Sequence, residues 1–416
     1  MRFRLIALAA TVFPLAAAAA QQSAPTRPRF EAGADTNDAR LYFDYGMRSL
    51  DDKPQESVRA FYWASRLSPS SADALYALYA ATQLAMSADE LGRYLDFSQS
   101  KRPAAYLAID SMLFRAYTID PFLQRRMERQ LAGRMIEAAY IRANPSIDRV
   151  RLNEYVLNRM RGMRYSASVQ AAEGRLGEAL ESYRKMLDDK SYTSKQHEAF
   201  AGSIHSERSL IFYRLGNLDS ARAEMITAIS LMSARDTSAK HAVFFYQSKS
   251  GLDVLLGKIY ERMNQPDQAR ESYQAALVED LSSYGAHRSL AQVDMAKNDT
   301  AAALLEMDLA VQLQPDDPVL RYGYATMLVT ARRDGDAAAQ LKKSIAADPY
   351  YSPPYMLLAR ISDIEDYTDE AVSEYRQFVS LAPRFDPQLP AARQRLAALT
   401  TAVASSSSSP STSPKP

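Results

Sequence analysis

The residue types that most often perform catalysis or bind metals are few and widely spaced in this chain. It contains no Cys, and its four His are His197, His205, His241 and His287. A chain without Cys has no disulfide, no thiolate metal ligand, no cysteine nucleophile and no Cys that could carry a lipid. No acidic ligand motif accompanies the histidines, so no metal site is predicted and they are interpreted as surface or packing residues.

Recognisable catalytic patterns are also missing from the sequence. It has no His-Glu-x-x-His, no Gly-x-Ser-x-Gly, no phosphate-binding loop and no dinucleotide-binding glycine pattern. Adjacent carboxylates do occur, but at the ends of predicted helices, where Asp is favoured for capping. The pairs are Asp188-Asp189, Asp316-Asp317 and Glu365-Asp366. The sequence therefore predicts a non-catalytic protein without a cofactor.

Composition indicates a folded, helical and nearly neutral chain. Hydrophobic residues make up 47% of the 416 residues, charged residues make up 24%, and there are 14 Gly. Frequent Ala-rich stretches favour helix, and the alternation of Val, Ile and Thr that is typical of strands is nearly absent. The formal charge of +1 gives no reason to expect nucleic acid as a partner.

The two ends of the chain differ in composition from the rest. Residues 1–20 combine two Arg, an apolar run and a final stretch of Ala, which predicts a secretory signal peptide that is cleaved near Ala20. An uncleaved N-terminal anchor is the alternative, and no later segment is apolar enough to span a membrane. We therefore expect export to the bacterial periplasm or envelope, not as a lipoprotein. Residues 21–38 are predicted to be a flexible leader, and 403–416 a disordered Ser/Pro-rich tail.

The elements that would position a site follow a repeat with a period of 34 residues. Small residues recur at Gly257, Ala291, Ala325 and Ala359 and again at Ala269, Ala303, Ala337 and Ala371, and large residues at Tyr273, Met307, Leu341 and Tyr375. Small residues let two helices approach closely, and the large residue fills the space between them. The turn positions, which must tolerate left-handed backbone geometry, are Asn264, Asn298, Arg332 and Asp366.

This spacing resembles the tetratricopeptide repeat (TPR), in which each unit is two antiparallel helices joined by a short turn. The resemblance covers four tandem units over 250–383. It implies an all-α, right-handed superhelical solenoid, because one unit cannot bury its own apolar face. Looser matches predict TPR-like helices over 39–99 and degenerate repeats over 166–249. Residues 100–165 are predicted to be helical, Arg-rich and unassigned to a repeat, and 384–402 should form a capping helix.

The resemblance also implies a binding surface. In this family the first helix of each unit lines a concave groove, and the corresponding positions here are the predicted partner-binding residues. They are Lys258, Glu261, Arg262, Arg288, Gln292, Tyr322, Thr326, Arg360 and Asp363. Bases outnumber acids among them, so an extended peptide or a protein terminus of acidic character would fit. A solvated charged face without a fixed ligand is the alternative.

The leading hypothesis is an exported, non-catalytic scaffold that binds a peptide or protein and, by analogy, supports an envelope or secretion complex. One alternative is an enzyme with a helical catalytic unit in 72–165, whose repeats select the substrate. Another is a peripheral binder of anionic envelope surfaces through 101–165, which holds 13 Lys or Arg against 6 Asp or Glu. Those cations would otherwise pair with acids elsewhere in the fold.

Overall fold

The structure is a computed structural model, and within the residues that it describes every regular element is an α-helix. The described residues are 24–50, 52–95, 103–120, 122, 167, 170–171, 174–188, 194–233 and 248–407. No strand occurs in these ranges, and consecutive helices pack as pairs. The prediction of an all-α solenoid of helix pairs is therefore confirmed.

The helices form two groups. The first group, the front unit, comprises α2 (Ala39–Ser49), α3 (Pro54–Leu67), α4 (Ala72–Ala85), α5 (Ala88–Leu95) and α6 (Ala104–Ile119). The second group, the arc, comprises α11 (Leu176–Asp188), α12 (Ser194–Leu215), α13 (Leu218–Ser233), α14 (Lys249–Arg262), α15 (Pro266–Glu279), α16 (Tyr284–Ala296), α17 (Thr300–Leu313), α18 (Pro318–Thr330), α19 (Asp334–Ala347), α20 (Pro353–Ile364), α21 (Thr368–Leu381) and α22 (Leu389–Ser407).

Each helix pair depends on a small residue facing a large one. A Cβ added to Gly257 on α14 would lie 2.4 Å from the ring of Tyr273 on α15, which is too close for any real contact. The front unit repeats this arrangement, because a Cβ on Gly46 of α2 would lie 2.7 Å from the ring of Phe61 on α3. Both rings are fully buried. The small residues therefore let an aromatic side chain fill the space between the paired helices.

The turns within the pairs adopt left-handed geometry at the four predicted positions. Their φ angles are 56° at Asn264, 64° at Asn298, 58° at Arg332 and 61° at Asp366. The amide of Asn264 donates to the carbonyl of Glu261, and the next amide donates to the carbonyl of Tyr260 at 3.0 Å. These bonds satisfy carbonyls at the end of α14, as helix ends require.

The last helix covers the end of the arc and is longer than predicted. Leu389, Ala392 and Leu399 of α22 are buried in one cluster with Phe378 of α21, so α22 covers the apolar face of the last pair. The sequence places the end of this helix at 402 and a disordered tail over 403–416. The helix continues through Ser407, because the tract after 402 has no Gly or Pro that would stop it before that residue. Residues 408–416 lie outside the described residues.

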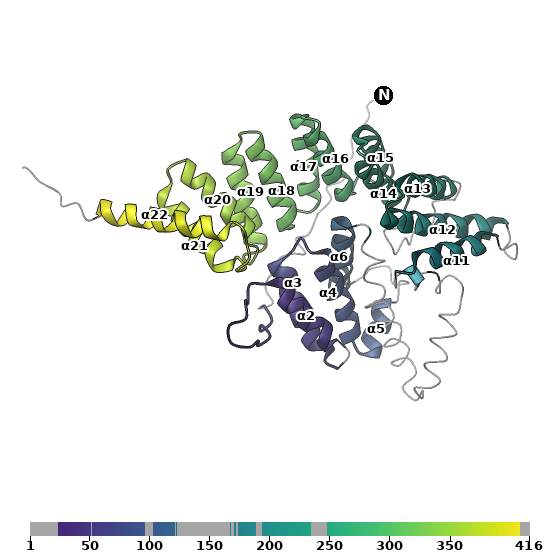
Figure 1. Ribbon diagram of the computed structural model, residues 1–416, viewed down its shortest axis with the longest axis horizontal. Helices are drawn as coiled ribbons and strands as arrows, with labels where there is room; N and C mark the ends of the chain where they lie inside the picture. Colours follow the sequence, from purple (N-terminus) through teal and green to yellow (C-terminus); the bar gives the residue numbers. More distant parts are fainter. Residues whose placement is uncertain are drawn as a thin grey trace, which may run out of the picture.

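The front unit does not extend the arc but lies on its inner side, as Figure 1 shows. Trp63 of α3 packs edge-on against Tyr350, with 4.9 Å between the ring centroids. Arg66 of α3 forms an ion pair with Asp348 at 3.1 Å, and these partners lie just before α20. The chain therefore folds back so that its first helices contact repeats far along the sequence.

The leader is packed, so the prediction of a flexible segment over 21–38 is wrong for 24–38. The Trp63 indole donates to the carbonyl of Pro25 at 2.8 Å, and Phe30 packs edge-on against Tyr42. Asn37 donates to the carbonyl of Ser380 at 2.8 Å, which joins the leader to the end of α21. The aromatic anchor and these hydrogen bonds give this Pro-rich segment enough contact to be ordered.

Candidate interaction surface on the inner face of the arc

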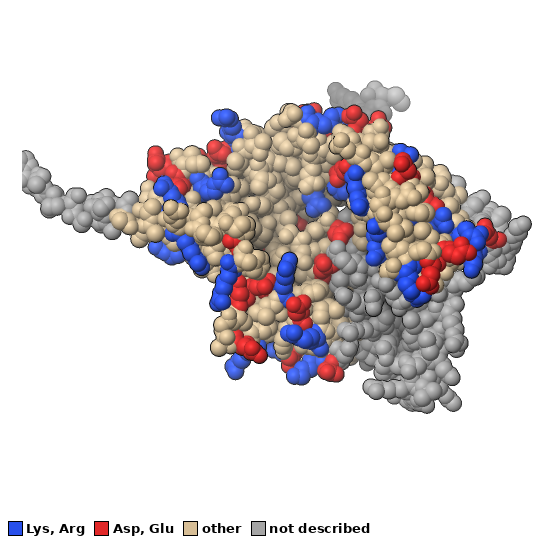
Figure 2. Space-filling model, in the orientation of Figure 1, with Lys and Arg blue, Asp and Glu red and all other residues tan. Residues whose placement is uncertain are grey.

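The predicted groove residues lie on α14, α16, α18 and α20, the first helices of four successive pairs. Figure 2 shows charged atoms of both signs around the hollow between the arc and the front unit. The inner face is therefore bounded partly by the chain itself. Most of the predicted residues contact other parts of the chain, and three of them, Arg262, Gln292 and Arg360, are exposed.

The predicted residues on α14 are mostly engaged inside the arc. Lys258 forms an ion pair with Glu261 at 3.0 Å, and burial lowers the pKa of this lysine. Glu261 also accepts a hydrogen bond from the Tyr273 hydroxyl at 2.8 Å. Arg262 is exposed, donates to the carbonyl of Tyr213 at 2.8 Å and stacks 4.5 Å from that ring. This cluster fixes α14 against its neighbours.

On α16, the groove is occupied by the end of α6 from the front unit. Arg288 donates to the carbonyl of Thr118, the penultimate residue of α6. A Cβ on Gly285 would lie 3.1 Å from the Thr118 methyl group, so the Thr118 side chain packs closely against the Gly285 backbone. Arg115 of α6 forms an ion pair with Asp317 at 3.2 Å. This stretch of the inner face is therefore an intramolecular interface.

The residues on α18 and the exposed Gln292 of α16 have weaker internal roles. Tyr322 is half-buried and packs edge-on against Tyr351, with 5.7 Å between the centroids. The Thr326 hydroxyl donates to the carbonyl of Gly323 within its own helix at 2.7 Å. Gln292 is exposed and has no hydrogen bond to any residue that the structure describes.

On α20, Asp363 is paired with an arginine, whereas Arg360 has no ion-pair partner among the described residues. Asp363 accepts two hydrogen bonds of 2.7 Å from Arg395 of α22. These bonds hold the pKa of Asp363 below its usual range. Arg360 is exposed and forms no hydrogen bond or ion pair with the described residues. Asp363 therefore ties the capping helix to the last pair, while the Arg360 charge faces solvent.

The seam between the front unit and the arc contains contacts that the sequence did not reveal. Asp348 is 2% exposed, and burial raises its pKa to about 6 despite the ion pair with Arg66. The one feature of the sequence that indicated such contacts was the excess of Lys and Arg over 101–165. Arg115, which pairs with Asp317, is the member of that set within the described residues, and the others lie outside them.

The histidines whose side chains are described have structural partners. His205 and Arg208 of α12 both bind Glu224 of α13, and His287 of α16 binds Glu306 of α17 at 2.6 Å. In the part of the chain that the structure describes, no three His, Asp or Glu side chains gather as metal ligands would. The side chain of His197 and all of His241 lie outside that part.

Two further expectations fall largely outside the described residues. The alternative of a helical catalytic unit over 72–165 concerns a region of which only 72–95, 103–120 and 122 are described. The signal peptide over 1–20 lies outside them entirely. None of the helices within the described ranges has the length and apolar character that crossing a bilayer requires.

Comparison with known proteins supports the repeat. Residues 254–277, which span parts of α14 and α15, match the family model described as tetratricopeptide repeat. The first helix pair of the 34-residue pattern therefore matches a TPR unit. No curated protein matches the chain.

Three solved structures illustrate the similarity of fold. The C-terminal part of a TPR repeat-containing protein from Cytophaga hutchinsonii is 20% identical, covers 58% of this chain and 88% of its own, and has a TM-score of 0.46. YrrB, described as a TPR protein with an unusual peptide-binding site, is 15% identical over 52% of this chain and 100% of its own, with a TM-score of 0.38. Yeast Tom70 is 16% identical over 88% of this chain and 90% of its own, with a TM-score of 0.40.

Proposed function

We propose that this chain is a non-catalytic TPR scaffold whose inner face captures an extended peptide or protein terminus of acidic character. One observation carries the proposal. The acids of the predicted groove are neutralised internally, since Glu261 pairs with Lys258 and Asp363 with Arg395. Arg262, Arg288 and Arg360 form no ion pair with a carboxylate among the described residues. Their uncompensated charges favour an anionic partner.

The partner would use the part of the inner face that the front unit leaves open. Arg288 is already bound to Thr118, so it would act through its charge and not as a free donor. Gln292 on α16 and Arg360 on α20 are exposed and can hydrogen-bond a peptide directly. Repeat arrays bind extended segments along such preformed surfaces, with little ordering cost for the receptor.

Export to the bacterial periplasm or envelope is part of this proposal and is supported by the composition of residues 1–20. The scaffold would there support assembly of an envelope or secretion complex. Sequencing the N-terminus of the chain recovered from a periplasmic fraction tests the export step. A first residue at Gln21 is expected, whereas an intact Met1 on a cytoplasmic product would contradict it.

The groove is tested by placing negative charge on two of its exposed positions, Gln292 and Arg360. We expect Gln292→Glu with Arg360→Glu to weaken binding of acidic extended peptides by about tenfold or more, because one favourable charge contact becomes repulsive and a neutral hydrogen-bonding group is replaced by a carboxylate. Binding is measured by fluorescence anisotropy on an array of labelled acidic, neutral and basic peptides. Pull-down from a periplasmic extract with mass spectrometry then identifies the natural partner.

The matched control is Gln274→Glu with Arg376→Glu, which makes the same charge change on α15 and α21, the second helices of two pairs. Both residues are exposed. The control should bind acidic peptides like the unmodified chain. Equal binding by the groove variant, or a preference for basic peptides in the unmodified chain, would refute the proposed function.

A further inference from the structure

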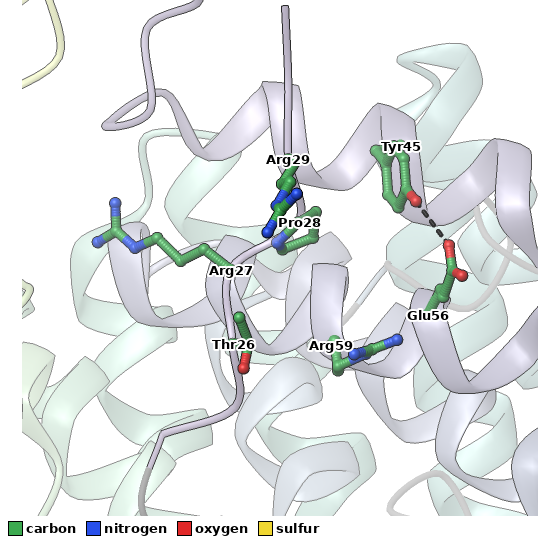
Figure 3. Close-up of a pocket in the computed structure, with 7 residues that line it drawn as sticks. All are labelled: Thr26, Arg27, Pro28, Arg29, Tyr45, Glu56 and Arg59. Carbon is green, nitrogen blue, oxygen red and sulfur yellow. Dashed lines mark hydrogen bonds between the residues drawn. The ribbon is translucent and has the colours of Figure 1, made fainter.

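A pocket of about 240 Å³ opens where the leader crosses α2 and α3. It is lined by Thr26, Arg27, Pro28, Arg29, Tyr45, Glu56 and Arg59. Four of these residues belong to the leader. The leader therefore forms one wall of the pocket, and this wall is present only while the leader is docked. Figure 3 shows Arg27 extending to the side opposite the Tyr45–Glu56 pair. The lining carries three guanidinium groups and one carboxylate.

Two of the charged residues in the pocket already have partners. Arg27 donates to the carbonyl of Thr36 at 3.0 Å and stacks 4.3 Å from the Trp63 ring. Glu56 accepts a hydrogen bond of 2.6 Å from the Tyr45 hydroxyl and lies 3.7 Å from the Lys53 ammonium. The Tyr45 bond, followed by smaller effects of Lys53 and Arg59, lowers the pKa of Glu56. This carboxylate is therefore ionised and already hydrogen-bonded.

The remaining two arginines have no ion-pair partner among the described residues, although Arg59 acts on the Glu56 carboxylate through its charge. Arg29 and Arg59 are exposed and form no hydrogen bond or ion pair with the residues that the structure describes. They line one cavity from different elements, the leader and α3, and Thr26 also lines it. Guanidinium groups present fixed forks of N–H donors that match the oxygens of carboxylate and phosphate.

We propose that this pocket binds an oxyanion, held between Arg29 and Arg59. The oxyanion is a phosphate or a carboxylate, supplied either free in solution or by an acidic peptide. Because the leader forms part of the wall, a ligand that binds the formed pocket stabilises the docked leader by mass action. The leader in turn contacts Trp63 and the end of α21. Oxyanion binding would therefore strengthen the contact between the two ends of the fold.

The test uses the full mature chain and two probes, sodium phosphate and an N-acetylated tetraglutamate peptide, at constant ionic strength. The chain has one Trp, so Trp63 fluorescence reports on the docked leader. We expect a saturable fluorescence change with at least one probe, and slower amide exchange over 24–38 when that probe is bound. Arg29→Gln with Arg59→Gln should weaken this binding by about tenfold or more, since each removes a charge-assisted hydrogen bond.

Arg48→Gln is the matched control, because Arg48 is an exposed arginine of α2 outside the pocket. It should bind the probe like the unmodified chain. Response to phosphate alone identifies a free oxyanion as the ligand, and response to tetraglutamate alone identifies a peptide carboxylate. The proposal is overturned if neither probe binds at millimolar concentration, or if the double variant binds as tightly as the control. These outcomes do not depend on the groove, whose residues stay unchanged.

Discussion

At the scale of single residues, the fit of a ring against a glycine decides whether two helices can pair. Gly257 and Tyr273 are 16 positions apart in the sequence, and the missing Cβ leaves the space that the ring fills. Residues this close in sequence are constrained by one turn, so their spacing alone predicted the contact. Gly46 and Phe61 repeat the arrangement although their unit is less regular.

We expect Gly257→Ala to destabilise the fold. Alanine favours helix by up to about 1 kcal/mol over glycine, but its Cβ would lie 2.4 Å from the buried Tyr273 ring. Overpacking of this kind costs about 1–3 kcal/mol, so the net change should be a loss. Urea unfolding followed by circular dichroism measures it. Gly323→Ala is the control, since nothing lies within 4 Å of an added Cβ there, and it should gain about 0.5–1 kcal/mol.

At the scale of elements, each of these helix pairs turns at a residue of left-handed geometry just after its first helix. Asn264, Asn298 and Asp366 are residue types that tolerate left-handed geometry, whereas Arg332 adopts it at a φ angle of 58° without that preference. The position of each turn was predictable from the period, and the geometry was enforced by the pairing of helices on either side. Residue type at the turn is therefore secondary to the packing around it.

Arg332→Asn should stabilise the turn after α18 by up to about 1 kcal/mol, because asparagine tolerates left-handed geometry better than arginine. The reciprocal change, Asn298→Arg, should destabilise the turn after α16 by a similar amount. Thermal unfolding of both variants measures the two effects. A shift of both melting temperatures in the same direction would contradict the explanation.

At the scale of the whole molecule, buried groups that bind protons make stability depend on pH. Burial raises the pKa of Asp253 and of Asp348 from 3.8 to about 6. Burial also opposes protonation of His287, but its hydrogen bonds to Glu306 and to the Leu281 carbonyl prevail and raise its pKa. All three groups bind protons more tightly in the folded chain. Folding is therefore favoured as pH falls through their folded pKa values.

The free energy of unfolding should therefore be higher near pH 5 than near pH 7.5. Ionisation of Asp348 alone would remove about 1.4 kcal/mol across this rise, since pH 5 lies about one unit below its folded pKa of about 6. Below about pH 4 the trend reverses, because Glu224 and Asp363 have lowered pKa values and lose their partners when protonated. Urea unfolding across this pH range gives the profile.

Asp348→Asn tests whether ionisation of Asp348 causes this dependence of the unfolding free energy on pH. The carboxamide cannot ionise, so the difference in unfolding free energy between pH 5 and pH 7.5 should shrink. Asp369→Asn, a change at an exposed acid of α21, should leave the difference as it was. Stability that increases from pH 5 to pH 7.5 in the unmodified chain would show that other groups dominate.

The sequence by itself determined the helix pairs, their turns and the small and large residues that pack them, because those contacts join residues within one repeat. The tertiary structure decided where the front unit and the leader lie. Asn37 binds the carbonyl of Ser380, which is 343 positions away, and Arg288 of the predicted groove binds α6. No period or local pattern links such distant residues. Which groove charges stay available to a partner thus depends on how the chain folds back on itself.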